Sequence, residues 1–207
     1  MREGRSGGAL AGRSEYSAGA VSPTSRSEAL IAEITREFPD FRLRPKSESA
    51  LQRAIDVVLK VITFGAQHEY LTRYHTVLGY TLWLPAKWPD SPDDARYILL
   101  RHERVHLRQR RRYGMIGMAL LYLLPILPLG LAYGRARIEW EAYTETLRAT
   151  AEVHGLDAAR DPALHEYLVR QFTSGAYGWM WPFPRAIRRW IAEVIAEMER
   201  ERTTSPG

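Results

Sequence analysis

The sequence has no cysteine among its 207 residues. This absence excludes disulfide bonds, a thiolate-ligated metal and a cysteine nucleophile. Residues 1–26 also lack the apolar run of a secretory signal, and they mix Gly, Ser and Ala with scattered charge. We therefore expect a disordered leader over residues 1–26, a loose tail over 203–207 and a cytoplasmic location.

The chain also has little excess charge of either sign. It has 29 Lys and Arg residues and 24 Asp and Glu residues, and 45% of all residues are hydrophobic. This balance is that of an ordinary globular protein, and residues 27–202 suffice for a single domain with one buried core. The mild basic excess does not indicate a nucleic-acid partner, and we expect none.

The spacing of apolar residues predicts a mainly helical chain. Ser27 is the expected cap of the first helix. Residues rich in Tyr, Thr, Val and Trp predict two short strands, 70–78 and 80–84, joined in a hairpin at Gly79. The fold class that follows is α+β, mainly α. We expect helices over residues 27–38, 47–64, 93–112, 135–154, 161–172 and from about 184 onward.

One of these helices carries the pattern H-E-x-x-H, formed by His102, Glu103 and His106. A helix places residues four apart one turn apart on the same face, so the two imidazoles can bind a single zinc ion. Glu103 lies about 100° around the same helix, where its carboxylate can act as general base on a water molecule. The plain alternative is a charged helix that carries two histidines by chance.

A catalytic zinc ion usually takes three protein ligands, so one more is expected on a later helix. The predicted helix over residues 135–154 offers Glu139 and Glu141. These two side chains point to nearly opposite sides of a helix, and only one of them can face the metal. Position alone leaves both open.

Residues 139–143 read E-x-x-A-Y. With H-E-x-x-H, this pattern resembles the zincin metallopeptidases of the gluzincin kind, and it is similar to the E-x-x-A-D motif of membrane peptidases that include the CAAX prenyl proteases. The resemblance implies a minimal zincin-like domain, one Zn²⁺ ion, a peptide or protein substrate and Glu139 as third ligand. The departure is Tyr143, which stands where those peptidases carry an Asp that orients a ligand histidine. Tyr143 can instead donate a hydrogen bond near the metal.

The strand before the motif helix fits the edge strand of a zincin, against which an extended substrate pairs. This interpretation assigns the substrate edge to Tyr80, Thr81, Leu82 and Trp83, and the alternative is a purely structural hairpin. His75 is a candidate oxyanion donor, as is His68.

Residues 113–134 contain no charged side chain. Pro125, Pro128 and Gly130 predict a turn inside this run, and each half is too short to cross a bilayer. A single span would also separate His106 from Glu139, so the segment must return to the side on which it starts. We expect a helical hairpin that fills the core or dips partly into a membrane surface. The arginines of the motif helix are either a solvated surface or a site for anionic headgroups.

These patterns predict a zinc-dependent metallohydrolase, specifically a peptidase, with Glu103 as general base. The alternative is a non-catalytic, zinc-stabilised module that contacts a membrane or a partner. The sequence leaves the substrate and the oligomeric state open.

Overall fold

The computed structural model describes residues 25–46, 76–123, 132–174 and 180–204. The α+β, mainly α prediction is confirmed, because the described residues form mostly helices and one small sheet. The helix expected over residues 47–64 lies outside the described residues, as do His68 and His75. In chain order the elements are α1 (Arg26–Glu37), β1 (Arg42–Pro45), β2 (Thr76–Leu78), β3 (Thr81–Leu84), α4 (Asp93–Leu123), α5 (Tyr133–His154), α6 (Leu156–Ala159), α7 (Pro162–Thr173) and α8 (Pro184–Thr204).

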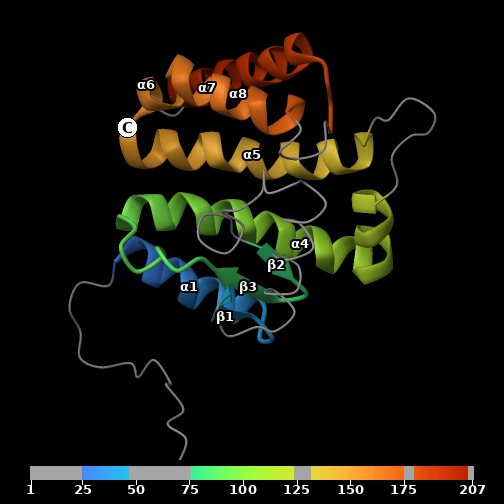
Figure 1. The fold of residues 1–207 in the computed structure, drawn as a ribbon. Helices are drawn as coiled ribbons and strands as arrows, with labels where there is room; N and C mark the ends of the chain where they lie inside the picture. The colour runs from blue at the N-terminus through green and yellow to red at the C-terminus, as the bar shows by residue number, and fades with distance from the viewer. Residues whose placement is uncertain (1–24, 47–75, 124–131, 175–179, 205–207) are drawn as a thin grey trace, which may run out of the picture.

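The helices stack in layers (Figure 1). α4 lies between the α1–sheet layer and α5, which runs antiparallel to it, and α6, α7 and α8 cover the far side of α5. One apolar core joins α1, β3 and α4 through residues such as Ile34, Leu82 and Leu107, while a second fills the space among α5 to α8. The seam between α4 and α5 therefore lies between two separate cores.

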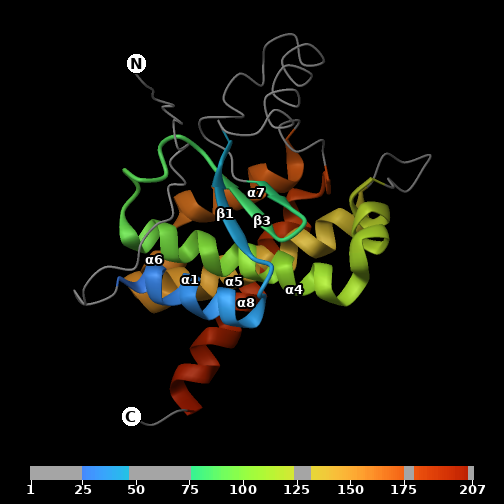
Figure 2. The ribbon, with the colours of Figure 1, turned by 90° about the horizontal axis from the view of Figure 1, so that it is seen from below.

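The sheet has three strands in the order β1-β3-β2. β3 pairs in parallel with β1, from Arg42 opposite Thr81 to Pro45 opposite Leu84, and antiparallel with β2. The hairpin predicted at Gly79 is confirmed, with a φ of 69° at that glycine. Figure 2 shows the sheet lying against one flank of the helical layers.

β3 is consequently the central strand, and the prediction of a substrate edge at Tyr80, Thr81, Leu82 and Trp83 is wrong. The Tyr80 carbonyl already accepts the Arg42 amide at 3.0 Å, and β1 occupies the side of β3 that the prediction left open. Residues 42–45 are too few and too polar to indicate a strand from sequence. Among the described strands, β1 and β2 form the edges.

The start of α1 is tied to the start of α4. Ser25, not Ser27, caps α1, and it forms a capping box with Glu28. Ser27 is buried, and its hydroxyl and amide both donate to the Asp93 carboxylate, which also accepts the Arg26 amide at 3.0 Å. Because an acid of α4 binds the positive end of the α1 dipole, the two helices are held in register.

α4 continues past the predicted end at Arg112, with a break at Gly114, where φ is 67°. A Cβ added to Gly134 at the start of α5 would lie 3.0 Å from the Leu121 carbonyl oxygen, so the chain does return beside itself. The sequence leaves open whether this region fills the core or dips into a membrane surface, and Met115 and Ile116, which are 68% and 75% exposed, do not fill the core. In the described ranges, no helix is long and apolar enough to cross a membrane.

At the C-terminus, α8 runs to Thr204 and so takes in the first two residues of the tail that we expected to be loose.

Candidate metal centre

The seam between α4 and α5 brings together His102, His106 and Glu139. The Nε2 atoms of the two histidines lie 3.2 Å apart. One Glu139 carboxylate oxygen lies 3.8 Å from Nε2 of His102 and 3.6 Å from Nε2 of His106. All three side chains are 12% exposed or less, so the cluster is enclosed.

These distances fit a metal ion. In a triangle with these sides, the point equidistant from all three corners lies about 2.1 Å from each, which is the usual length of zinc bonds to histidine and carboxylate. The three donors also match in kind, since two neutral imidazoles and one carboxylate leave a position for a fourth ligand. These residues could therefore hold one metal ion without a change of helix packing.

A hydrogen bond to its other ring nitrogen orients His102. Its Nδ1 lies 3.0 Å from the Thr146 hydroxyl oxygen, and that hydroxyl donates to the Ala142 carbonyl. Since the Thr146 hydrogen is used in this way, the His102 Nδ1–H must donate to Thr146. The tautomer that results has its lone pair on Nε2, the atom that faces the cluster.

His106 is oriented in the same way by an amide. Its Nδ1 lies 2.9 Å from Oε1 of Gln109, while the Gln109 amide nitrogen donates to the Ile138 carbonyl at 3.0 Å and to the Glu141 carboxylate at 2.8 Å. The Gln109 oxygen is thus an acceptor for the His106 Nδ1–H. Glu141, the rival third ligand, contacts Gln109 and not the cluster, so the structure brings Glu139 to the histidines and places Glu141 behind one of them.

The Glu139 carboxylate favours the protonated form of His106. Burial opposes protonation of His106, but Glu139 first, and then Glu103 and Gln109, raise its pKa to about 9. Without a metal, His106 is therefore protonated at neutral pH, and its positive charge balances the negative charge of the neighbouring carboxylates. A divalent cation competes for the same place and displaces that proton when it binds.

Glu103 lies beside the cluster without belonging to it. The side chain is 8% exposed, and burial, reinforced by Glu139, raises its pKa to about 7 against the opposing charges of His106 and Lys46. Arg104, its neighbour in sequence, turns instead to Glu33 and Glu37 in the described part of the chain. A carboxyl group with this pKa changes protonation state near neutral pH, as a general base or acid must.

Three supporting residues were not predicted from the sequence. Lys46 follows β1, is only 1% exposed and acts electrostatically on Glu103. Gln109 and Thr146 fix the two histidine rings. Gln109 lies three residues after His106, a spacing that does place it beside that ring on a helix. Lys46 gives no such signal, because its position depends on how β1 pairs.

The other residues predicted for the site are Tyr143, His75 and the arginines of the motif helix. Tyr143 is buried, and its ring meets the His102 ring edge-on at a centroid distance of 4.8 Å. His75 lies outside the described residues. Among the motif-helix arginines, Arg108 and Arg111 pair with Glu37, and Arg110 lies over the Tyr80 ring.

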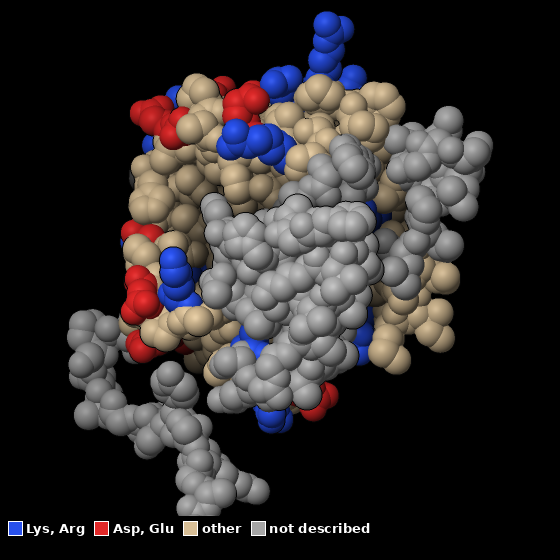
Figure 3. Space-filling model, viewed as in Figure 1, with Lys and Arg blue, Asp and Glu red and all other residues tan. Residues whose placement is uncertain are grey.

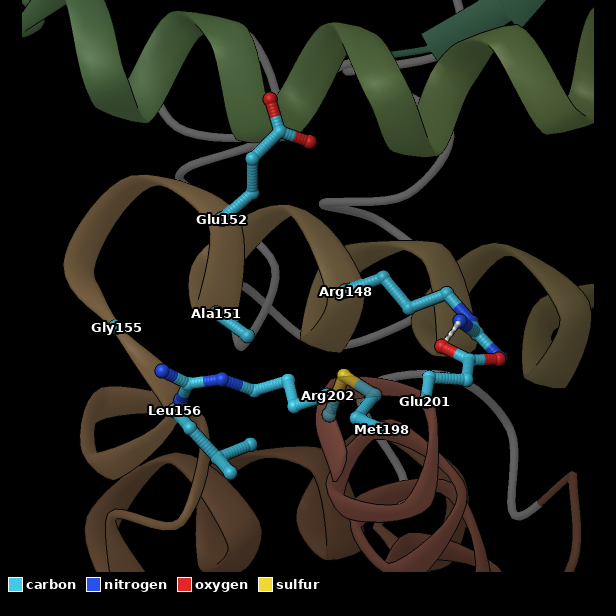
Figure 4. Close-up of a pocket in the computed structure, with 8 residues that line it drawn as sticks. All are labelled: Arg148, Ala151, Glu152, Gly155, Leu156, Met198, Glu201 and Arg202. Atoms are coloured by element: carbon cyan, nitrogen blue, oxygen red, sulfur yellow. Dashed lines mark hydrogen bonds and ion pairs between the residues drawn. The ribbon is translucent and has the colours of Figure 1, made fainter. Parts of the chain in front are cut away.

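An open hollow of about 780 Å³ lies on the other side of α5, between α5, α6 and α8 (Figure 4). The ion pair between Arg148 and Glu201, 2.8 Å long, borders it, and Glu152 points away from it toward α4. None of the three cluster residues lines this hollow, so it belongs to a different face of the molecule.

Comparison with known proteins yields no relative: no family model matches the chain, and no curated protein or solved structure is similar to it.

Proposed function

We propose that the chain is a zinc-dependent hydrolase that cleaves peptide bonds. One observation carries this proposal. Two Nε2 atoms and one carboxylate oxygen lie 3.2 to 3.8 Å from one another in a buried seam, close enough to bind one zinc ion together. His102, His106 and Glu139 would hold the ion. A zinc ion bound there supplies a Lewis acid for a carbonyl oxygen and lowers the pKa of a water molecule.

The protein's own part in the reaction falls chiefly to Glu103. With a pKa near 7, its carboxylate accepts a proton from the attacking water and then returns it to the leaving amine. Lys46 keeps this pKa from rising further, because its positive charge favours the ionised form of Glu103. Thr146 and Gln109 keep both ligand rings in the tautomer that offers Nε2.

An extended substrate needs a strand edge with which to pair. β3 is paired on both sides, so β1 and β2 are the candidates among the described strands. β2 is favoured, because it is the edge strand that packs against α4, the helix that carries Glu103. A peptide paired with β2 would thus lie beside that helix.

The test is Glu103→Gln in the full-length, zinc-loaded protein, assayed on a mixed-sequence peptide library by mass spectrometry. Zinc content should stay equal to that of the wild type, while cleavage falls by about 100-fold or more, the usual contribution of a general base. Undiminished cleavage by Glu103→Gln would refute this role. Absence of cleavage by the wild type, with zinc bound, would refute the enzymatic proposal itself and favour a non-catalytic zinc module.

Metal content tests the ligands separately from activity. Glu139→Gln should lower zinc stoichiometry after dialysis, whereas Glu145→Gln, the same change on the same helix at a residue paired with Arg101, should not. Equal zinc content in both variants would contradict the assignment of Glu139.

A further inference from the structure

Large apolar side chains are exposed mainly at one end of the molecule. Seven are exposed in the described residues, and six of them lie at this end, namely Tyr113, Met115, Ile116, Leu120, Tyr133 and Phe183; the seventh is Tyr167. We call these six residues the apolar end. Isolated exposed apolar residues are normal on protein surfaces, but a group of this size indicates a contact surface.

The six residues come from three segments that touch one another. Leu121 of α4 lies against Gly134 of α5, the neighbour of Tyr133. The Tyr133 ring lies 5.3 Å from that of Trp181, which in turn lies 5.1 Å from that of Phe183. In Figures 1 and 2 the end of α4 lies at an extremity of the fold, away from α1, and Figure 3 shows uncharged side chains over it. The apolar end is therefore one surface.

The charge around this surface has one sign. No acidic residue occurs in the sequence between Glu103 and Glu139, nor between Glu166 and Glu193. Arg112, Arg137 and Arg185 are exposed close to the apolar end, and none of them forms an ion pair within the described ranges. Arg112 lies over the ring of Tyr113 at 5.2 Å, so a cation and an apolar ring are presented together.

We propose that the apolar end docks on the surface of an anionic lipid membrane. Apolar side chains enter the boundary between headgroups and acyl chains, and the arginines contact the negative headgroups. A protein partner would have to offer acidic groups around an apolar pocket, whereas a bilayer offers both features at any position. The break at Gly114 turns the apolar part of α4 away from the motif part, so that it can lie on a surface.

Docking in this way would bring the metal centre close to the membrane. His106 precedes Gly114 by two turns of α4, and Glu139 follows Tyr133 by less than two turns of α5, so the cluster lies about 10 Å along both helices from the apolar end. Substrates held at a membrane surface would then be within reach. This extension rests on the proposed hydrolase function, whereas the docking itself does not.

Sedimentation with sucrose-loaded vesicles tests the docking on the zinc-loaded, full-length protein. With vesicles of phosphatidylcholine and phosphatidylserine at three to one, the wild type should sediment, and Ile116→Glu should bind at least about 10-fold more weakly, since it places a charge in the apolar boundary. Tyr167→Glu also places a charge at an exposed apolar residue, but outside this surface, and should bind as the wild type does. Arg112→Gln should weaken binding to these vesicles but not to pure phosphatidylcholine, and 0.5 M salt should do the same.

Three results would overturn the proposal. The first is a wild type that stays in the supernatant with anionic vesicles. The second is equal binding by Ile116→Glu and Tyr167→Glu. The third is a dimer in light scattering that Ile116→Glu converts to a monomer, since a second copy would then cover this surface. Peptide cleavage by Ile116→Glu in the absence of vesicles should equal that of the wild type, which separates failure of docking from failure of the proposed hydrolysis.

Discussion

Glu37, the last residue of α1, joins that helix to the helix that carries the candidate metal ligands. Its carboxylate accepts hydrogen bonds of 2.7 Å from Arg104 and from Arg108, and Arg111 lies 3.5 Å away. Arg108 first, and then Arg104, lower its pKa to about 2 against the opposing effect of burial. We predict that Glu37→Gln destabilises the protein in a manner that depends on pH.

The size of the expected destabilisation follows from the lowered pKa of Glu37. A fall from 4.5 to about 2 corresponds to roughly 3 kcal/mol at most. Arg108 is 52% exposed and Arg111 56%, so solvent screens part of the attraction. We therefore expect a loss of about 1–2 kcal/mol in the free energy of unfolding at pH 7, or a fall in Tm of a few degrees, about 2–8 °C, for a chain of this length.

The direction of the pKa shift determines how the stabilisation by Glu37 changes with pH. Because the folded-state pKa lies below the unfolded value, Glu37 stabilises fully above pH 4.5 and loses this effect as the pH falls toward 2. Urea unfolding of wild type and Glu37→Gln at pH 7 and pH 3 should thus give a difference that shrinks to less than half at pH 3. Glu33→Gln is the control, because Glu33 also pairs with Arg104 but is 51% exposed. A difference that is the same at both pH values, or equal losses in the two variants, would refute the reasoning.

Two further predictions concern the seam between α4 and α5. Gln109→Leu removes the acceptor of the His106 Nδ1–H and should weaken zinc binding by about 10- to 100-fold in competition with a chromophoric chelator; unchanged affinity would show that Gln109 does not orient the ring. Gly134→Ala places a Cβ 3.0 Å from the Leu121 carbonyl oxygen and should lower the free energy of unfolding by about 1–3 kcal/mol in urea, while a neutral result would mean that the two backbones can separate at no cost.

The helices were predictable because their signals are local. The spacing of His102 and His106 places both imidazoles on one face whatever surrounds the helix. Gly155 ends α5, and Asp161 caps α7 before Pro162, as the sequence indicates. These features depend on residues within a turn or two of one another, so no knowledge of packing is needed to find them.

The sheet and the third ligand depend on packing. Position in the sequence leaves Glu139 and Glu141 both open, and only the motif resemblance favours Glu139. The central place of β3 depends on β1, a strand of only four residues that lies far away in sequence and includes two arginines and a proline. The choice between Glu139 and Glu141 depends on how α5 is rotated about its axis. That rotation follows from the apolar residues that α5 buries on both sides, including Ile138, Trp140 and Ala142.

The same packing determines what a metal ion does for stability. α4 and α5 are joined by contacts that need no metal: Arg101 binds Glu145 and Glu152, and the Tyr97 hydroxyl donates to Glu152 at 2.7 Å. The three donor atoms of the cluster already lie close enough to one another to bind a single zinc ion. We therefore predict that the chelated protein remains folded, with an unchanged far-UV circular dichroism spectrum, and that zinc at 100 times its Kd adds about 2.7 kcal/mol, or roughly 5–10 °C in Tm. If chelation instead unfolded the chain, the ion would be a structural one, and the buried Glu103 beside it would need no catalytic role.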